Sequence, residues 1–135
     1  MKKICIIGCG NIGSRHLQGI AKIRYPLSID IVEPNKKSKK IAKIRLEEIN
    51  KKKIPHKISW YNSIDELKNN YDLIVLSTTS ENRVKLFSNL VERGNRVFLL
   101  EKIVCQSIQD YKKLLKIIHK NKVNAWVNTP RRYMN

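Results

Sequence analysis

The chain has 135 residues, 41% of them hydrophobic, and carries a formal net charge of +17, so it is long enough for one compact domain with a real core. No apolar run approaches the length of a membrane span, and the short apolar stretch at the N-terminus is broken by glycines and lacks a secretory cleavage site. The three cysteines suit neither a disulfide framework nor a zinc motif, and the three histidines are too scattered for a metal site. These features predict a soluble cytoplasmic protein without a bound metal.

A glycine-rich segment follows the first apolar run of the chain. Residues 3–7 predict one buried β-strand, and the segment GCGNIG comes next at residues 8–13. A helical pattern then covers residues 12–23, with four apolar residues on one face: Ile12, Leu17, Ile20 and Ala21. A strand, a G-x-G-x-x-G segment and a helix in this order are the context of a dinucleotide-binding fingerprint.

Each glycine of this segment has an expected role. Gly8 permits the tight turn out of the strand, Gly10 lets a pyrophosphate approach the backbone, and Gly13 lets the helix pack close to the strand. The first N–H groups of the helix, from Asn11 and Ile12 onward, lack internal acceptors and are expected to bind phosphate.

A second apolar segment, residues 27–32, ends at Glu33, which lies 20 residues beyond Gly13. At this distance the dinucleotide-binding pattern expects an acid that binds the adenosine ribose hydroxyls. A carboxylate there hydrogen-bonds two hydroxyls and repels a 2′-phosphate, which favours NAD over NADP. Lys36 and Lys37 stand close by and could tolerate a phosphate, so NADP stays open as the coenzyme.

The positive charge is concentrated between residues 36 and 57, where ten lysines and arginines accompany only Glu47 and Glu48. Pro34-Asn35 is expected to start a helix here, and residues 51–55 are read as a basic loop. The expected inner residues of this helix are Ile41, Ala42, Ile44, Leu46 and Ile49. Because no aromatic residue interleaves the cations, the pattern favours a solvated face over a nucleic-acid footprint, and nucleic-acid binding ranks last among the functions considered.

The middle of the chain continues the alternation of strands and helices. Residues 57–61 predict a short third strand, Ser63 and Glu66 form a capping box, and residues 72–77 predict a central strand buried on both faces. Ser80 is expected to cap the next helix and Gly94 to end it in a left-handed conformation. The inward residues of that helix are predicted to be Val84, Phe87, Leu90 and Val91.

The last elements follow the same alternation. Residues 96–100 predict a fifth strand, and the apolar spacing after Ser107 and Asp110 predicts a helix with Tyr111, Leu114, Leu115 and Ile118 on one face. Alternating apolar residues over 123–127 predict a sixth strand. The whole pattern predicts an α/β fold, a doubly wound parallel Rossmann sheet of about six strands in the order 3-2-1-4-5-6, with helices on both faces.

Ligands of such a sheet bind outside the carboxyl ends of its strands. The residues that follow strands four and five are therefore candidates for the coenzyme site, namely Ser77, Thr78 and Thr79, and Glu101 and Lys102. The pair Glu101-Lys102 could orient a substrate hydroxyl or tune the lysine for proton transfer, or it could be an ordinary surface dipeptide.

The order of these motifs resembles the N-terminal domain of the glucose–fructose oxidoreductase / inositol dehydrogenase family (Gfo/Idh/MocA). The family typically has G-x-G-x-x-G followed by a histidine, T-P-x-x-x-H after strand four and E-K-P after strand five. The residues that carry the resemblance are GCGNIGSRH at 8–16, Glu33, STTSENR at 77–83, EKI at 101–103, Val127-Asn128 and the Arg-rich end. The glycine motif combined with Glu-Lys after strand five is fairly specific.

The resemblance implies NAD(P)-dependent oxidation or reduction of a sugar, cyclitol or similar hydroxyl compound, with Lys102 as the catalytic residue at the substrate. Three positions depart from the family pattern: Thr79 and Ile103 stand where proline is usual, and Arg83 stands where histidine is usual. The family proline after the lysine is often cis, whereas a non-proline residue strongly prefers a trans peptide. The bond between Lys102 and Ile103 is therefore expected to be trans, with a changed direction for Lys102.

Members of this family continue into a second domain that supplies most of the substrate pocket and the oligomer interface. The resemblance therefore implies a dinucleotide-binding domain over residues 1–128 and, over residues 129–135, the start of a crossover to a missing substrate domain. The chain alone is expected to bind its coenzyme and to turn over poorly, and a homo-oligomer is one expected assembly. The alternative is a non-catalytic nucleotide-binding module, or a subunit that pairs with a separate partner chain.

Overall fold

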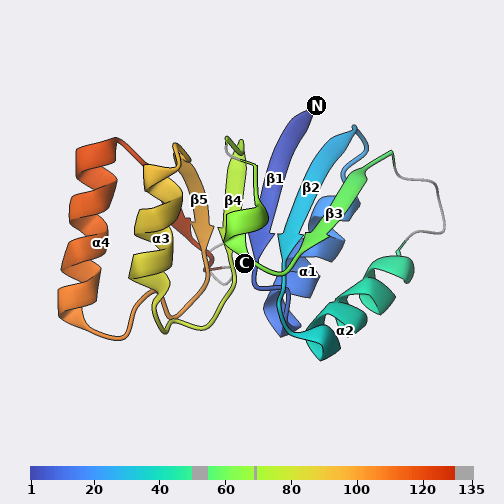
Figure 1. The fold of residues 1–135 in the computed structure, drawn as a ribbon, viewed down its shortest axis with the longest axis horizontal. Coiled ribbons are helices and arrows are strands. Elements are labelled where there is room, and N and C mark those ends of the chain that lie inside the picture. Colours follow the sequence, from blue (N-terminus) through green and yellow to red (C-terminus); the bar gives the residue numbers. More distant parts are fainter. Residues whose placement is uncertain (50–54, 69, 130–135) are drawn as a thin grey trace, which may run out of the picture.

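The computed structural model describes residues 1–49, 55–68 and 70–129, and within these ranges six parallel strands form one sheet. The strands are β1 (Lys2–Ile7), β2 (Leu27–Val32), β3 (Lys57–Tyr61), β4 (Leu73–Leu76), β5 (Val97–Leu100) and β6 (Asn124–Val127). Their order across the sheet is β3-β2-β1-β4-β5-β6, and each neighbouring pair is parallel (Figure 1). The predicted fold class and strand order are confirmed.

Helices cover both faces of the sheet. They are α1 (Asn11–Ala21), α2 (Lys36–Glu47), α3 (Arg83–Glu92) and α4 (Ile108–Asn121), and a short 3-10 helix η1 (Ile64–Glu66) precedes β4. One hydrophobic cluster joins α1 and α2 to the sheet, and a second joins α3 and α4 to its other face. The two clusters share no buried residue, so the sheet separates two cores.

The central strand β1 shows why the sheet has two cores. Successive side chains of a strand point to opposite faces. Ile4 and Ile6 therefore join the core beneath α1 and α2, whereas Cys5 and Ile7 join the core beneath α3 and α4. The part of β1 that is covered on both faces, residues 4–7, is apolar at every position and is the continuous apolar run seen in the sequence.

Three of the predicted helix starts are confirmed. The side chain of Asn35 accepts a hydrogen bond from Ser38 N at 2.9 Å, and Ser107 Oγ accepts one from Asp110 N at 3.1 Å. Ser63 and Glu66 form the predicted capping box, although the helix it opens is the single 3-10 turn η1. Gly94, with φ of +93°, follows the end of α3 as expected.

Other local expectations are wrong. Helix α3 begins at Arg83 after Asn82, which adopts φ of +55° and forms no side-chain cap, so Ser80 is not the cap. Ile12, Ile41 and Ile44 are 53%, 39% and 49% exposed. In α2 only Ala42 and Leu46 are buried, so the surface that this helix packs against the core is narrow. Ile41 and Ile44 lie at the edge of that surface and stay exposed. The predicted helical face is therefore broader than the buried one.

Two expectations fall largely on residues that are not described. The basic loop over residues 51–55 includes 51–54, and the crossover over 129–135 includes 130–135, all outside the described ranges. Among the described helices, none combines the length and the apolar character needed to cross a membrane.

The core beneath α3 contains a buried aromatic pair that gives a stability prediction. The ring centroids of Phe87 and Phe98 lie 4.6 Å apart, and both residues are fully buried. We expect Phe98→Ala to lower the free energy of unfolding by roughly 3–5 kcal/mol, because it opens a cavity between α3 and β5. Tyr25→Ala, at a site that is 57% exposed, should change it by less than about 0.5 kcal/mol. Urea unfolding of both variants measures the difference, and equal effects would contradict this account of the core.

Candidate functional site

In the loop between β1 and α1, two of the three glycines pack against other backbone atoms, and the third borders open space. A Cβ on Gly13 would lie 1.9 Å from the carbonyl oxygen of Gly8, and one on Gly8, whose φ is +84°, would lie 2.7 Å from Thr78 N. A Cβ on Gly10 would meet nothing within 4 Å. The first two glycines therefore allow close packing, and Gly10 leaves the outer side of the loop free for a ligand.

The N-terminus of α1 faces this free side. Gly10 is the N-cap, it forms no side-chain cap, and the first turn contains no acidic residue. The N-terminal amide groups and the positive end of the helix dipole favour an anion at such a position. Arg45 of α2 adds a further cation here, since its Nη1 donates to Ser14 Oγ at 2.6 Å and to the Asn11 carbonyl at 3.2 Å.

Glu33, directly after β2, lies beside the glycine loop. It is 6% exposed, its Oε2 accepts a hydrogen bond from Cys9 N at 2.7 Å, and its Oε1 accepts one from Asn35 N at 2.9 Å. The carboxylate therefore holds the glycine loop against the end of β2, a role that the sequence analysis missed. Two hydrogen bonds leave acceptor capacity on a carboxylate, which has about four lone-pair sites.

The neighbouring thiol of Cys9 is inert in this setting. Burial, followed by the negative charge of Glu33, raises the pKa of Cys9 to about 12. A thiol with this pKa stays neutral at physiological pH, and the thiolate is the reactive form. Cys9 is completely buried and fills space in the core beneath α1 and α2.

A cavity of about 450 Å³ opens at the carboxyl ends of β1, β2 and β4. It brings together six of the predicted site residues, which are Gly8, Gly10, Glu33, Ser77, Thr78 and Thr79. Asn62, Ser63 and Ile64 also line it and were missed, although they follow the third strand and the same carboxyl-end rule could have found them. A larger hollow of about 760 Å³ lies between α3 and α4, but no residue of the glycine loop lines it.

Ser77 has an internal role at this cavity. Its hydroxyl donates to the carbonyl of Gly8 at 2.6 Å, and its backbone N–H donates to the carbonyl of Ile7 at 2.9 Å. The end of β4 is thereby joined to the glycine loop. Thr78 and Thr79 follow it on the lining of the cavity.

Glu101 belongs to a second cluster, away from the glycines. It is 8% exposed, and its Oε1 lies 2.5 Å from His16 Nε2 and accepts a hydrogen bond from Asn128 Nδ2 at 2.6 Å. These contacts join α1, β5 and the end of β6 around one carboxylate. The reading of Glu101-Lys102 as a surface dipeptide is wrong for Glu101, whereas Lys102 is exposed.

Arg83 is the residue that the sequence analysis least anticipated. It is 2% exposed, and its guanidinium donates to the carbonyls of Thr78, Glu101 and Ile103. Burial lowers the pKa of Arg83 from its usual value. A signal was present in the sequence, because Arg83 lies four and seven residues before Phe87 and Leu90 and so shares their inward helical face.

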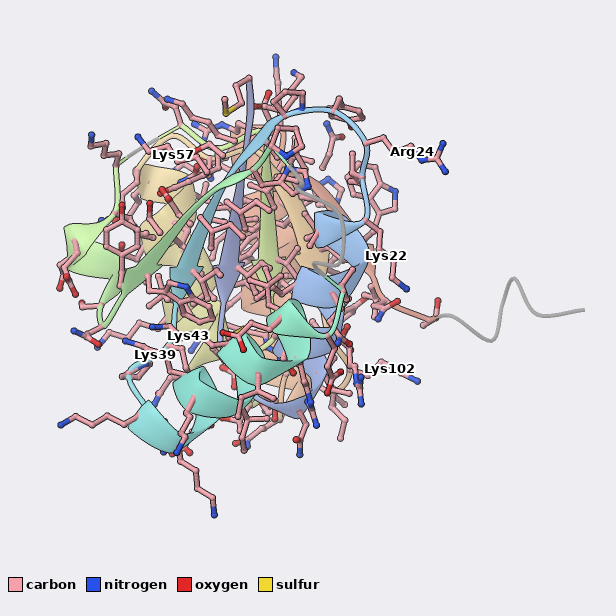
Figure 2. All side chains as sticks on the ribbon, turned by 90° about the vertical axis from the view of Figure 1, so that its right-hand side faces the viewer. Lys22, Arg24, Lys39, Lys43, Lys57 and Lys102 are labelled. Carbon is pink, nitrogen blue, oxygen red and sulfur yellow. The ribbon has the colours of Figure 1, made fainter. Side chains whose placement is uncertain are left out.

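The peptide bond between Lys102 and Ile103 is cis, so the expectation of a trans bond is wrong. The carbonyls of Glu101 and Ile103, on either side of Lys102, both accept hydrogen bonds from Arg83. These long-range contacts hold the backbone on both sides of Lys102. Figure 2 shows Lys102 at the outside of the molecule.

The basic residues labelled in Figure 2 come from several elements. Lys22, Arg24 and Lys102 lie along the right of the view and Lys57 at its upper left, whereas Lys39 and Lys43 both lie on α2. Lys43 Nζ lies 5.4 Å from the centroid of the Trp60 ring, which adds a cation–π contact.

The geometry agrees with the comparisons with known proteins. The sequence profile of the Gfo/Idh/MocA oxidoreductase family, described as an NAD-binding Rossmann fold, matches residues 2–129. The chain belongs to this family, and the part matched is its NAD-binding domain. A comparison with curated protein sequences gives no significant match.

Solved structures with the same fold are longer proteins. Scyllo-inositol dehydrogenase from Lactobacillus casei, with bound NAD(H) and scyllo-inositol, has a TM-score of 0.76 at 17% identity, over 100% of this chain and 38% of that one. A Gfo/Idh/MocA oxidoreductase from Vibrio cholerae has a TM-score of 0.76 at 18% identity, over 98% and 40%. The WlbA dehydrogenase from Bordetella pertussis, in complex with NADH and UDP-GlcNAcA, has a TM-score of 0.73 at 19% identity, over 93% and 35%. The chain thus spans about two fifths of the length of these proteins.

The different environments of the glycines give a second stability prediction. We expect Gly13→Ala to lower the free energy of unfolding by roughly 2 kcal/mol or more, because its Cβ would overlap the Gly8 carbonyl oxygen and push α1 from β1. Gly10→Ala, in open space, should cost at most about 1 kcal/mol, the usual loss for alanine at an N-cap. Chemical unfolding compares the two, and the prediction does not survive if Gly10→Ala is the more damaging.

Proposed function

We propose that this chain binds NAD(H) across the carboxyl edge of its sheet and forms the coenzyme half of a dehydrogenase that acts on a sugar, cyclitol or related hydroxyl compound. The proposal rests on the glycine loop, which has no room for a side chain at Gly8 or Gly13 but borders open space at Gly10. Diphosphate is the coenzyme group that fits this opening, because it needs backbone N–H donors, positive potential and no intervening side chain.

The residues around the opening fit the remainder of the coenzyme. The cavity beside Glu33 would take the adenosine half, with the ribose hydroxyls donating to the carboxylate oxygens. Gly8, Asn11, Ile12 and Gly13 would surround the diphosphate. Ser77, Thr78 and Thr79, and then Glu101 and Lys102, would lead toward the nicotinamide end, since they follow β4 and β5 along the same edge.

Lys102 is the proposed catalytic residue. NAD supplies the acceptor for a hydride when it is bound. In the direction of oxidation the substrate hydroxyl also loses a proton, which the neutral amine form of Lys102 would accept as it orients that hydroxyl. The exposed position of Lys102 leaves its Nζ able to meet a substrate carried by another domain or chain.

The proposed substrate class rests on the family and on two of the related proteins. The Lactobacillus casei enzyme was solved with scyllo-inositol, and the Bordetella pertussis enzyme was solved with UDP-GlcNAcA. Those proteins contain more than twice the length matched here. We therefore propose that turnover requires a second domain, which the 135-residue chain would meet either in a longer protein or in a partner chain. A cytoplasmic location accords with this function and stays a prediction.

Calorimetric titration with NADH tests the proposed function. The chain should bind NADH with a dissociation constant between micromolar and millimolar. Gly10→Ala should weaken binding roughly tenfold or more, because its methyl group occupies the space of the diphosphate while the fold is kept. Thermal unfolding of the same samples controls for stability. Absence of heat at millimolar NADH for the unsubstituted chain would overturn the proposal.

Coenzyme selection gives a separate prediction for Glu33. We expect NADH to bind more tightly than NADPH, and Glu33→Ala to weaken NADH roughly tenfold while affecting NADPH less, because the carboxylate attracts two hydroxyls and repels a 2′-phosphate. Glu47→Ala, an exposed glutamate in the last turn of α2, removes the same charge and should change neither affinity. If Glu33→Ala leaves the ratio of NADH to NADPH affinities unchanged, Glu33 does not bind the ribose hydroxyls.

A further inference from the structure

A fully buried arginine lies between the two loops that carry the candidate nicotinamide-end residues. Arg83 is the first residue of α3, and its side chain runs inward, where burial leaves 2% of the residue exposed. Burying a guanidinium has a substantial free-energy cost unless strong acceptors replace water. The nature of those acceptors indicates what the residue does.

Among the described residues, the hydrogen-bond acceptors of Arg83 are all backbone carbonyls. Nη2 donates to Thr78 in the loop after β4, and Nη1 donates to Glu101 and to Ile103 (2.6 Å) in the loop after β5. Val104 O lies at 3.5 Å, at the limit of a hydrogen bond. The two terminal nitrogens of one planar group thus bind different loops, a geometry that a lysine ammonium cannot reproduce.

The loop after β5 is held by this contact independently of its carboxylate. The side chain of Glu101 is held by His16 and Asn128, whereas Arg83 contacts the main chain on both sides of Lys102. Nε of Arg83 has no hydrogen-bond partner among the described residues. The position of the guanidinium is therefore set by the carbonyls that its two terminal nitrogens reach.

We propose that Arg83 is a positioning residue, which locks the loop of residues 101–104 to the loop after β4 and so fixes Lys102 at the nicotinamide end of the coenzyme. This inference rests on the proposed function. It assigns a role to the position at which this chain departs from the histidine usual in the family. Arg83 touches neither coenzyme nor substrate, so its effect is transmitted through the backbone of the loop.

The test compares NADH with ADP-ribose, which lacks the nicotinamide. We expect Arg83→Met and Arg83→Lys to weaken NADH binding roughly tenfold while ADP-ribose affinity changes less than about twofold, because only the nicotinamide end depends on the loop. Lys85→Met removes an exposed charge from the same helix and should change neither affinity. A general loss of structure would lower both affinities together, so parallel losses, or no loss, would overturn the positioning role.

Amide hydrogen exchange on the unsubstituted chain provides a measurement that needs no folded variant. A peptide that covers residues 101–104 should gain protection with NADH and gain none with ADP-ribose. Equal protection by both ligands would overturn the placement of this loop at the nicotinamide end and leave coenzyme binding intact. If the unsubstituted chain binds neither ligand, the proposed function fails, and the role of Arg83 fails with it.

Discussion

The contact between Gly13 and the carbonyl of Gly8 determines the arrangement of the site. With no side chain at position 13, α1 approaches the end of β1 to a distance that any Cβ would prevent. The first turn of α1 is thereby held at the carboxyl edge of the sheet, with its N-terminal amide groups beside the open side of Gly10. Glu33 and Ser77 complete the arrangement from the neighbouring strands, because each hydrogen-bonds the backbone of the glycine loop.

Three charged residues are buried along this same edge, and each is satisfied in a different way. Glu33 accepts from two backbone N–H groups, Glu101 contacts His16 and Asn128, and Arg83 donates to backbone carbonyls. Leaving any of them without partners would cost several kcal/mol in order of magnitude, so their contacts fix loops that have no regular secondary structure. The edge that would receive a ligand is therefore also held by buried polar contacts.

The parts of this structure that follow from local sequence were predictable, and the parts that depend on distant contacts were not. Periodicity and capping residues such as Asn35 and Ser107 were sufficient for the strands and most helices, and their alternation with the dinucleotide-binding pattern predicted the strand order. The strand-helix alternation placed Glu33 and the glycine loop at one edge. Arg83 required a different kind of information, because its partners lie 5, 18 and 20 residues away in two loops.

The exposed isoleucines of α2 also could not be predicted from local sequence. The spacing of apolar residues does not show how much of a helix surface its neighbours cover. Ile41 and Ile44 fit a broad helical face, yet only Ala42 and Leu46 of α2 reach the core. The His16–Glu101–Asn128 cluster was hidden for a related reason. Its members come from three separate elements, and each alone looks like an ordinary polar residue.

The large positive charge bears on ligand selection less than its size suggests. Of the eleven acidic residues, Asp30, Glu33 and Glu101 are buried, so the surface is more basic than the composition implies. Such a surface attracts any phosphate-bearing ligand, including one with a 2′-phosphate, but exposed lysines act through water and are screened within about 10 Å at ordinary salt. Lys39, which is half-buried, donates to Asn62 at the lining of the cavity. Glu33 acts at hydrogen-bond distance from a buried position, where screening is weak. In the proposed complex the lysines would therefore favour the diphosphate in general, and the single carboxylate would decide between the two coenzymes.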